Sequence, residues 1–277
     1  MREDTALGSS MPKRNRKRRL IVVLIALAAV IVLGVVLSYP IRSFVAINTM
    51  RPLESYQVTK DVYAINNKFV NLYLFKTGGD GNATNEAGSG SGDETYILFD
   101  AGADSDATAS ELDRLGIKPG DVAAVFLTHT DYDHVDALSL FPAAGVYMAK
   151  SNLDFLDTLA GRSRSKAFLG QAVRYSDLGD GEVVTIQGTR IQCVFTPGHT
   201  DGSASYVVDG RYLFSGDTLN LENGKAVTFN AVFNMNDKEQ EQSIRKLARL
   251  EGIETLFTMH TGYTDDFETA FSEWSDQ

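Results

Sequence analysis

The sequence predicts an α/β domain that is preceded by one transmembrane helix. An unbroken apolar run covers Leu20–Leu37. From about Ser55 onward, short segments rich in Val, Tyr and Phe alternate with helical patterns, which is typical of an α/β domain. A composition of 43% apolar and 22% charged residues allows a substantial core. We therefore expect four parts: a basic cytoplasmic tail (1–19), a transmembrane signal anchor (20–38), a linker (39–54) and one α/β domain (55–277).

The apolar run has the length and the flanking charges of a signal anchor. Its eighteen residues span about 27 Å as a helix, which matches the core of a bilayer. The run has no polar face, as a core helix would, and residues 38–40 offer only a weak site for cleavage as a signal peptide. Seven basic and two acidic side chains lie within residues 1–19. The positive charge places that end in the cytoplasm and the domain outside the cytoplasmic membrane.

The charge and the cysteine count exclude several classes of protein. The formal net charge is −10, and the basic residues of the tail leave the body more acidic still. An acidic body is a poor partner for nucleic acid, which requires clustered Lys and Arg. Cys193 is the one cysteine, so no internal disulfide can form. Its apolar neighbours indicate a buried, inert thiol.

The first part of the domain reads as a set of strands. Val58–Ile65 and Phe69–Phe75 are predicted strands, and a third resumes at Thr95–Phe99. Residues 77–94 between them are rich in Gly, Ser and Asn, so we expect a flexible loop that closes a hairpin. Asn82 starts a glycosylation sequon, which we interpret as chance.

The rest of the domain alternates between helices and strands, and several predicted strands end just before a histidine. The predicted helices cover 108–115, 135–141 and 240–250. The predicted strands cover 122–127, two segments within 183–195 around Gly188, the hairpin 205–208 and 212–214, and 254–259.

Potential metal ligands gather in one short segment and recur at three later positions. His129, Asp131, Asp133 and His134 place four potential ligands within six residues, followed by His199, Asp217 and His260. A metal needs lone pairs that converge from several directions. A lone His after a strand is more often a structural, hydrogen-bonded residue. Here, however, every histidine of the chain lies among small or polar residues of the ligand type, and their order is specific.

These residues resemble the metallo-β-lactamase superfamily. The family pattern is a His-x-His-x-Asp-His cluster, a His after Pro-Gly, an Asp after Ser-Gly and a final His. The strand that ends in Phe99-Asp100-Ala101-Gly102 also resembles the first family motif, whose Asp supports the site. The resemblance covers about residues 55–270. It implies a four-layer αββα sandwich with two metals at one edge, between the sheets.

The resemblance also implies a ligand set and a chemistry. One ion would be held by His129, Asp131 and His199, the other by Asp133, His134 and His260, and Asp217 would bridge them. Two divalent ions, zinc by family precedent, would share a hydroxide that attacks an electrophilic centre, with Asp133 as the catalytic residue that orients it. The expected function is therefore metal-dependent hydrolysis of a small molecule, whether an ester, lactone, thioester, lactam or phosphodiester.

One residue departs from the family pattern. Asp131 stands where most members have a second His. A carboxylate there makes the ligand set harder, which suits iron or manganese better, and flavodiiron proteins resemble this arrangement. The alternatives are therefore a di-iron oxidoreductase and a non-catalytic metal-binding ectodomain. No flavin-binding domain is visible, and the chain is too short to hold one.

The substrate contacts are less well defined by the sequence. The segment Asn220–Asp237 would lie partly near the pocket by family precedent, so Asn230, Phe233 and Asn234 are candidates to contact substrate; an ordinary surface loop is the alternative. Tyr132 and Tyr263 flank ligands and could donate to a developing oxyanion, or could simply pack.

Overall fold

The computed structural model describes residues 13–78 and 94–275, and the chain divides into two units, Met1–Ala46 and Ile47–Gln277. Helix α1 (Lys13–Thr49) contains the apolar run. Its part from Arg18 to Thr49 is long and apolar enough to cross a membrane. The side chains of the run are exposed, which does not fit a core helix and leaves a membrane anchor or a signal sequence. The helix also extends into the segment expected as a linker, residues 39–54.

The second unit contains two mixed sheets. The first has seven strands in the order of the sequence, antiparallel from β1 to β4 and parallel from β4 to β7. Parallel neighbours place the carboxyl ends of their strands at the same edge. The strands are β1 (Tyr56–Gln57), β2 (Val62–Asn67), β3 (Val70–Lys76), β4 (Tyr96–Phe99), β5 (Val122–Leu127), β6 (Gly145–Ala149) and β7 (Tyr175–Leu178).

The second sheet has the strand order β15-β14-β11-β10-β9-β8, and β11 and β14 are its one parallel pair among the described residues. A separate hairpin, β12–β13, lies outside both sheets. The strands are β8 (Val183–Ile186), β9 (Thr189–Phe195), β10 (Ala204–Val208), β11 (Tyr212–Phe214), β12 (Leu219–Glu222), β13 (Lys225–Thr228), β14 (Thr255–Thr258) and β15 (Gly262–Thr264).

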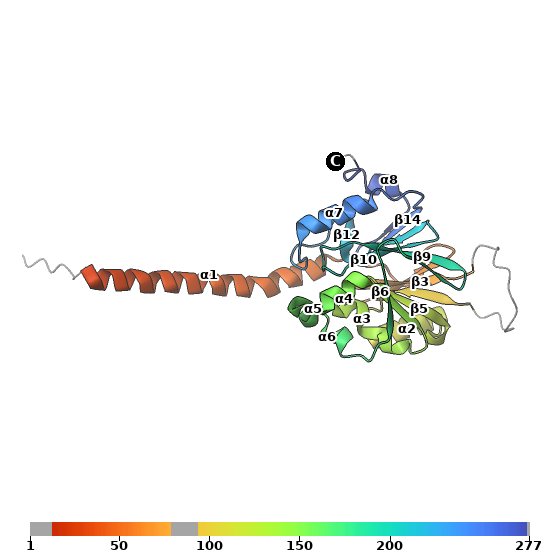
Figure 1. Cartoon of the computed structure of the whole chain (residues 1–277), viewed down its shortest axis with the longest axis horizontal. Coiled ribbons are helices and arrows are strands. Elements are labelled where there is room, and N and C mark those ends of the chain that lie inside the picture. The colour runs from red at the N-terminus through yellow and green to blue at the C-terminus, as the bar shows by residue number, and fades with distance from the viewer. Residues whose placement is uncertain (1–12, 79–93, 276–277) are drawn as a thin grey trace, which may run out of the picture. The chain divides into compact units, whose positions relative to one another are not determined.

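Helices cover the outer faces of both sheets and complete a four-layer αββα sandwich (Figure 1). The helices on the side of the first sheet are α2 (Ser105–Leu115), η1 (Pro119–Asp121), α3 (Tyr132–Val135), η2 (Asp136–Leu140), α4 (Lys150–Leu156), α5 (Leu159–Arg164) and α6 (Lys166–Leu169). Those on the side of the second sheet are η3 (Gly216–Thr218), α7 (Asp237–Leu247) and α8 (Phe267–Ala270). The fold expected from the resemblance is confirmed.

Alternation along the strands divides the apolar side chains between the layers. In β11, Phe214 points into the core between the sheets, whereas Leu213 packs with α7 on the outer face. In β3, Tyr73 faces the inner core and Leu72 faces the helices of the other side. Both faces of the central strands are therefore buried, which is why these strands read as continuous apolar runs.

Aromatic rings and two tyrosine hydroxyls join the sheets. The ring of Phe214 lies 4.0 Å from that of Phe99, centroid to centroid, and 4.9 Å from that of Phe257. The hydroxyl of Tyr206 donates to the carbonyl of Leu127 at 2.8 Å, and that of Tyr73 donates to the carbonyl of Thr258, also at 2.8 Å. Both accepting carbonyls lie at strand ends, two residues before a histidine of the candidate site.

Most predicted elements are present, with shifted boundaries. The helix expected at 135–141 is instead the short α3 followed by the 3₁₀ helix η2. The helix expected at 240–250 begins earlier, at Asp237, because the side chain of Asn236 accepts a hydrogen bond from Glu239 N and caps it. The loop at 77–94 and the sequon at Asn82 lie almost wholly outside the described residues. Residues 142–178, for which we predicted no element, contain two strands and three helices.

The contact between the two sheets makes a first prediction. Phe214→Ala should reduce the free energy of unfolding by about 3–5 kcal/mol, because it removes a fully buried ring and leaves a cavity between the sheets. Leu159→Ala, at a side chain that is 90% exposed, should change it by less than about 0.5 kcal/mol. Chemical denaturation of the full-length chain in detergent measures both values, and equal effects would contradict the assignment of this core.

Candidate metal centre

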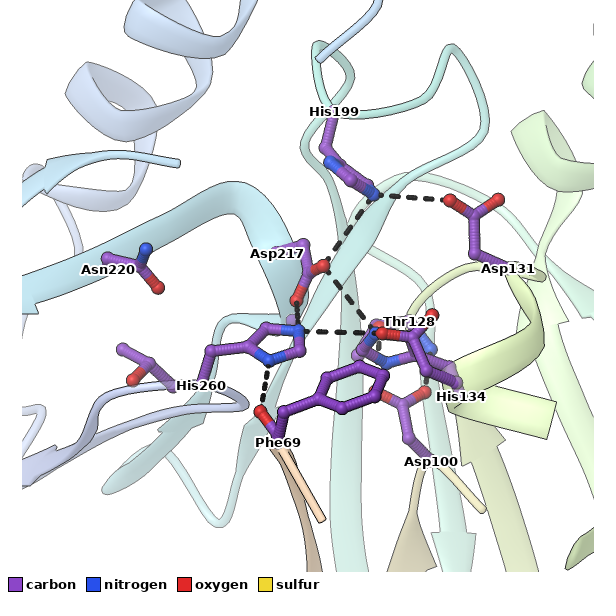
Figure 2. A network of polar contacts seen from close by, with 12 residues as sticks. Phe69, Asp100, Thr128, Asp131, His134, His199, Asp217, Asn220 and His260 are labelled. Atoms are coloured by element: carbon purple, nitrogen blue, oxygen red, sulfur yellow. Dashed lines mark hydrogen bonds and ion pairs between the residues drawn. The ribbon is translucent and has the colours of Figure 1, made fainter. Parts of the chain in front are cut away.

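The four histidines and the acidic candidates meet at one edge of the sandwich. His129 follows β5, and the segment after it leads into α3 with Asp131 as its N-cap. His199 follows β9, Asp217 lies in η3 directly after β11, and His260 follows β14. Loops at the ends of strands from both sheets thus bring together residues that are far apart in the sequence (Figure 2).

The side chain of Asp217 lies at the centre of this group. Its Oδ2 is 3.5 Å from His134 Nε2, 3.6 Å from His199 Nε2 and 4.0 Å from His129 Nε2. Its Oδ1 is 3.2 Å from His260 Nε2. One buried carboxylate therefore contacts all four imidazoles, which is the position expected for a bridging ligand.

The other two carboxylates lie on opposite sides of the group. Asp131 Oδ2 is 3.4 Å from His199 Nε2 and 3.9 Å from His129 Nε2. Asp133 Oδ2 is 3.6 Å from His134 Nε2 and 3.8 Å from His260 Nε2. Two triplets result, His129–Asp131–His199 and Asp133–His134–His260, and within each triplet the ligand atoms lie within 4.8 Å of one another. They are the two triplets that the resemblance implied.

Several of these atoms have no hydrogen-bond partner among the described residues. They are Nε2 of His129, His134 and His260, and Oδ1 of Asp217, all of them buried. A buried polar atom without a partner is costly, so such atoms are rare in folded proteins. Three imidazole nitrogens and a carboxylate oxygen that converge in this way form a donor set that fits a divalent metal ion such as zinc.

Each imidazole is held through its other nitrogen. His134 Nδ1 lies 2.9 Å from Asp100 Oδ2, and His260 Nδ1 donates to the carbonyl of Phe69 at 2.7 Å. His129 Nδ1 lies 3.1 Å from Thr128 Oγ1, and His199 Nδ1 lies 3.3 Å from Asn234 Oδ1. Such contacts direct Nε2 into the site, as the outer contacts of metal-ligating histidines usually do.

Asp100 has the supporting position that the first family motif implied. Its carboxylate accepts hydrogen bonds from the backbone N and from Oγ1 of Thr128, each at 2.8 Å, in addition to its contact with His134. Its backbone has a φ of 58°, a left-handed conformation that Asp and Asn tolerate better than other non-glycine residues.

The loop that carries His199 depends on a close approach to α7. Gly198 has a φ of 137°, and a Cβ there would lie 2.4 Å from the backbone N of Gln240. The fully buried side chain of Gln240 donates to the carbonyl of Asp217 at 3.1 Å and to Asn234 Oδ1 at 3.0 Å. Helix α7 therefore positions two of the candidate ligands.

Burial and neighbouring charges set the protonation states on the Asp131 side. Burial lowers the pKa of the His129 imidazole well below its usual value, and nearby His134 and His199 lower it further. Burial would raise the pKa of the Asp131 carboxyl, but the adjacent imidazoles of His199 and His129 and the guanidinium of Arg164 outweigh burial and hold it well below its usual value. A neutral imidazole and an ionised carboxylate are the forms that bind a metal.

The two carboxylates on the other side differ from each other. Burial opposes ionisation of Asp217, yet the neighbouring His260 and His134 hold its pKa well below the usual value. Burial raises the pKa of Asp133, and the negative charge of Asp217 adds to this effect against the opposing influence of His134 and His260. The carboxyl group of Asp217 therefore ionises more readily than that of Asp133.

The residues expected to contact substrate have varied surroundings. The Asn234 amide donates to Phe229 O at 3.0 Å and to Gln240 Oε1 at 2.8 Å, in addition to its contact with His199, so its place is behind a candidate ligand. Asn230 accepts from the backbone N of Val232 at 3.0 Å within its own loop. Tyr263 stacks on Phe257, with centroids 5.9 Å apart, and is 37% exposed.

Two aromatic rings that the sequence analysis did not single out, those of Phe69 and Phe229, border the site together with Tyr132. Phe69 stacks on the ring of His260, with centroids 6.2 Å apart. Phe229 lies 5.0 Å from the ring of His199 and 5.3 Å from that of His260. Tyr132, half exposed, makes an edge contact with Phe69 at 6.4 Å. These rings form an apolar border beside the imidazoles, and Tyr132 adds a hydroxyl group to it.

Arg164, at the end of α5, is a further residue that the sequence analysis missed. Its guanidinium contacts both carboxylate oxygens of Asp131, lies 3.2 Å from His199 Nε2 and donates to the carbonyl of Phe233 at 3.0 Å. No motif marks Arg164, because it belongs to the stretch 142–178 for which we predicted no element. Only the folded chain brings it to Asp131, 33 positions away.

The single thiol takes no part in the site. Cys193 is fully buried in the core between the sheets. Burial raises the pKa of the Cys193 thiol to about 12, so it is protonated at neutral pH and is a poor nucleophile.

Comparison with known proteins agrees with this geometry. A family model described as "Metallo-beta-lactamase superfamily" matches residues 90–260, more than half of the chain. The chain belongs to the metallo-β-lactamase superfamily.

Among curated sequences, the chain is similar to several hydrolases. It is 35% identical over 118 residues to the "Probable polyketide biosynthesis zinc-dependent hydrolase PksB" of Bacillus subtilis, which covers 42% of this chain and 44% of that protein. It is 29% identical over 137 residues to a "Hydroxyacylglutathione hydrolase" of Photobacterium profundum, covering 50% and 47%. The chain thus spans about half the length of these relatives.

Solved structures share the fold. A metallo-beta-lactamase family protein from Thermus thermophilus superimposes with a TM-score of 0.57 at 22% identity, and 78% of each chain is covered. An archaeal metallo-beta-lactamase superfamily protein from Sulfolobus tokodaii gives a TM-score of 0.53 at 18% identity, with 78% of this chain and 85% of that chain covered. At this identity the likeness concerns the fold alone.

The support that Asp100 gives to His134 makes a second prediction. Asp100→Asn should weaken zinc binding by about 10- to 100-fold, the usual cost of losing an outer contact of a metal ligand. Asn tolerates the same backbone conformation, so the variant should fold, but its NH2 group cannot accept from His134 Nδ1 and the metal-free chain should lose about 1–3 kcal/mol of stability. Competition of the purified chain with a chromophoric chelator measures the affinity. Asp113→Asn, at an exposed position of α2, is the control, and equal affinities in the two variants would contradict the assigned support.

Proposed function

We propose that this chain is a metal-dependent hydrolase that acts on a small molecule at the site around Asp217. The observation that carries the proposal is the set of buried, unpartnered imidazole and carboxylate atoms that converge there. The ligands would be His129, Asp131 and His199 for one ion, and Asp133, His134 and His260 for the other, with Asp217 between them. Zinc suits this mixture of nitrogen and oxygen donors, and one relative is named as zinc-dependent.

A divalent metal bound there would supply a nucleophilic water at neutral pH and would polarise the electrophilic oxygen of the substrate. Within the chain, Asp133 is placed to orient the attacking water and accept its proton, because its carboxylate lies at the edge of the group beside His134 and His260. The rings of Phe69 and Phe229 exclude bulk water from one side of the imidazoles. The half-exposed Tyr132 could donate a hydrogen bond to the developing oxyanion.

The substrate class that we propose is an ester, thioester, lactone, lactam or phosphodiester. Hydrolases of hydroxyacylglutathione and of polyketide biosynthesis are among the similar proteins, which makes acyl compounds the first to test. Arg164 is already engaged by Asp131, so it is not free to recognise a phosphate-rich substrate. The proposed substrate contacts include Tyr263, Asn230 and, through its hold on His199, Asn234.

The di-iron alternative depends on Asp131 as a metal-ligating carboxylate. Both oxygens of Asp131 contact the guanidinium of Arg164, which neutralises the carboxylate charge and weakens the preference for iron that a free carboxylate would give. Bound iron, a visible absorption band and oxygen consumption with an electron donor would favour this alternative over hydrolysis.

We further propose that α1 anchors the chain in the cytoplasmic membrane as a single pass, with the basic tail inside and the domain outside. The length of α1, its apolar run and the basic residues that precede this run support this orientation.

The proposed hydrolysis makes a third prediction. The full-length chain in detergent should hydrolyse at least one member of a panel of acyl thioesters, esters, lactones, lactams and phosphodiesters. A chelator should abolish turnover, and added zinc should restore it. Asp133→Asn should lower kcat by about 100-fold or more, as is usual for loss of a general base. Metal content must be measured in parallel, because Asp133 is also a proposed ligand.

Asp157→Asn, at a carboxylate that is 88% exposed, is the matched control and should keep full activity. Metal without turnover in the whole panel would favour the non-catalytic ectodomain. Turnover that survives complete metal removal would contradict the proposal.

The proposed anchor makes a fourth prediction. The expressed chain should stay in the membrane fraction after a carbonate wash at high pH, because an apolar helix of this length does not leave a bilayer. Intact mass spectrometry should show the N-terminal residues still attached. A shorter, soluble product that begins after residue 37 would instead indicate a cleaved signal sequence.

A further inference from the structure

The two halves of the proposed metal site differ in one respect that the family pattern does not contain. In one half, the guanidinium of Arg164 contacts the ligand atoms. Its Nη2 contacts Asp131 Oδ2 and lies 3.2 Å from His199 Nε2, while its Nε donates to Asp131 Oδ1 at 3.1 Å. These two ligand atoms, Asp131 Oδ2 and His199 Nε2, are themselves 3.4 Å apart. One nitrogen of Arg164 thus lies where both could bind a cation.

The tautomer of His199 determines that Arg164 and a metal ion would compete for the same nitrogen, Nε2. The Asn234 amide donates to Phe229 O and to Gln240 Oε1, which fixes its Oδ1 as the atom that faces His199 Nδ1. Because Oδ1 can only accept, Nδ1 carries the proton and Nε2 presents its lone pair. That lone pair is directed at Arg164, and a metal ion would need the same lone pair at about 2.0–2.1 Å.

In the half beside Asp133, the corresponding ligand atoms make no hydrogen bond to the described residues. Nε2 of His134, Nε2 of His260 and Oδ1 of Asp217 lack hydrogen-bond partners among residues 13–78 and 94–275. In the half beside Asp131, Nε2 of His129 also lacks a partner among the described residues, but Nε2 of His199 is satisfied by Arg164. An ion that binds beside Asp133 therefore meets ligand atoms that are otherwise without partners. An ion beside Asp131 must first displace the bidentate ion pair between Arg164 and Asp131, one of the strongest side-chain contacts.

Arg164 is held by more than its contact with Asp131. Its Nη1 donates to the carbonyl of Phe233 at 3.0 Å, and its side chain is about three quarters buried. An arginine cannot lose its charge in a protein, so it cannot make way for a cation by deprotonation. The guanidinium has to move out, and the loop that carries Phe233 has to release it.

We propose that Arg164 is an internal competitor for the metal, so that the first ion binds at Asp133, His134, His260 and Asp217, and the second binds at His129, Asp131 and His199 only when Arg164 withdraws. This inference rests on the proposed metal site and adds an order of filling to it. Arg164 acts through Asp131 and His199, and is therefore a positioning residue.

Stepwise metal binding tests the inference without reference to activity. The full-length chain in detergent is freed of metal with a chelator and titrated with Zn²⁺ by calorimetry and by competition with a chromophoric chelator. The wild type should bind one ion tightly and a second at least tenfold more weakly. Arg164→Gln should reduce the ratio of the two dissociation constants by at least tenfold, mainly through tighter binding of the second ion.

A matched control and two further variants locate the effect. Arg162→Gln lies on the same helix, at an exposed side chain that pairs with Asp157, and should keep the ratio of the wild type. Asp131→His removes the partner of Arg164 and supplies an imidazole, so it should also reduce the ratio, and it provides the test if Arg164→Gln does not fold. His260→Ala should weaken the first ion, whereas Asp131→Asn should leave it unchanged within about threefold.

The outcomes separate this inference from the proposed function. Two ions of equal affinity in the wild type would overturn the order of filling and leave the metal-dependent hydrolase intact. An unchanged ratio in both Arg164→Gln and Asp131→His would also overturn it, and so would a weaker second ion in Arg164→Gln. Absence of any zinc binding by the wild type would overturn the proposed function, and this inference with it.

Discussion

The buried carboxylate of Asp217 is the feature on which the candidate site depends. It contacts four imidazoles that are themselves buried, and three of those imidazoles direct an unpartnered nitrogen towards it. Each such atom costs about 1–3 kcal/mol when it is buried without a partner. A fold can retain this arrangement when the gain from a bound cation offsets the cost, so metal binding and stability should be closely linked in this protein.

The sandwich holds this group together from two directions. The aromatic core joins the two sheets directly behind the site, through Phe99, Phe214 and Phe257. Outer contacts such as those of Asp100 and Gln240 then fix the individual ligands and their loops. The rigid part of the fold therefore sets the distance between the two sets of ligands, and the loops set their orientation. Membership of the superfamily is consistent with this division, since one fold can support many reactions at such an edge.

Asp131 changes character once its surroundings are known. In the sequence it reads as a carboxylate that replaces a histidine ligand and makes the site harder. In the structure its charge is neutralised by Arg164, so the pair together is closer to a neutral group than to an added anion. The preference for iron or manganese that a free carboxylate would favour is accordingly weakened, and the two halves of the site become unequal.

The sequence by itself determined the α/β class, the apolar N-terminal helix, the superfamily and the seven candidate ligands, because these depend on local periodicity and on short motifs with specific order. Only the tertiary structure decided which groups hold the ligands in place and which group competes with a metal ion for them. Asn234 lies behind His199, and Arg164 reaches Asp131 from a stretch without any recognisable pattern. The physical reason is that a ligand motif is local in the chain. The groups that hold or compete with it need only be close in space, and closeness in space is created when the two sheets and their helices pack together.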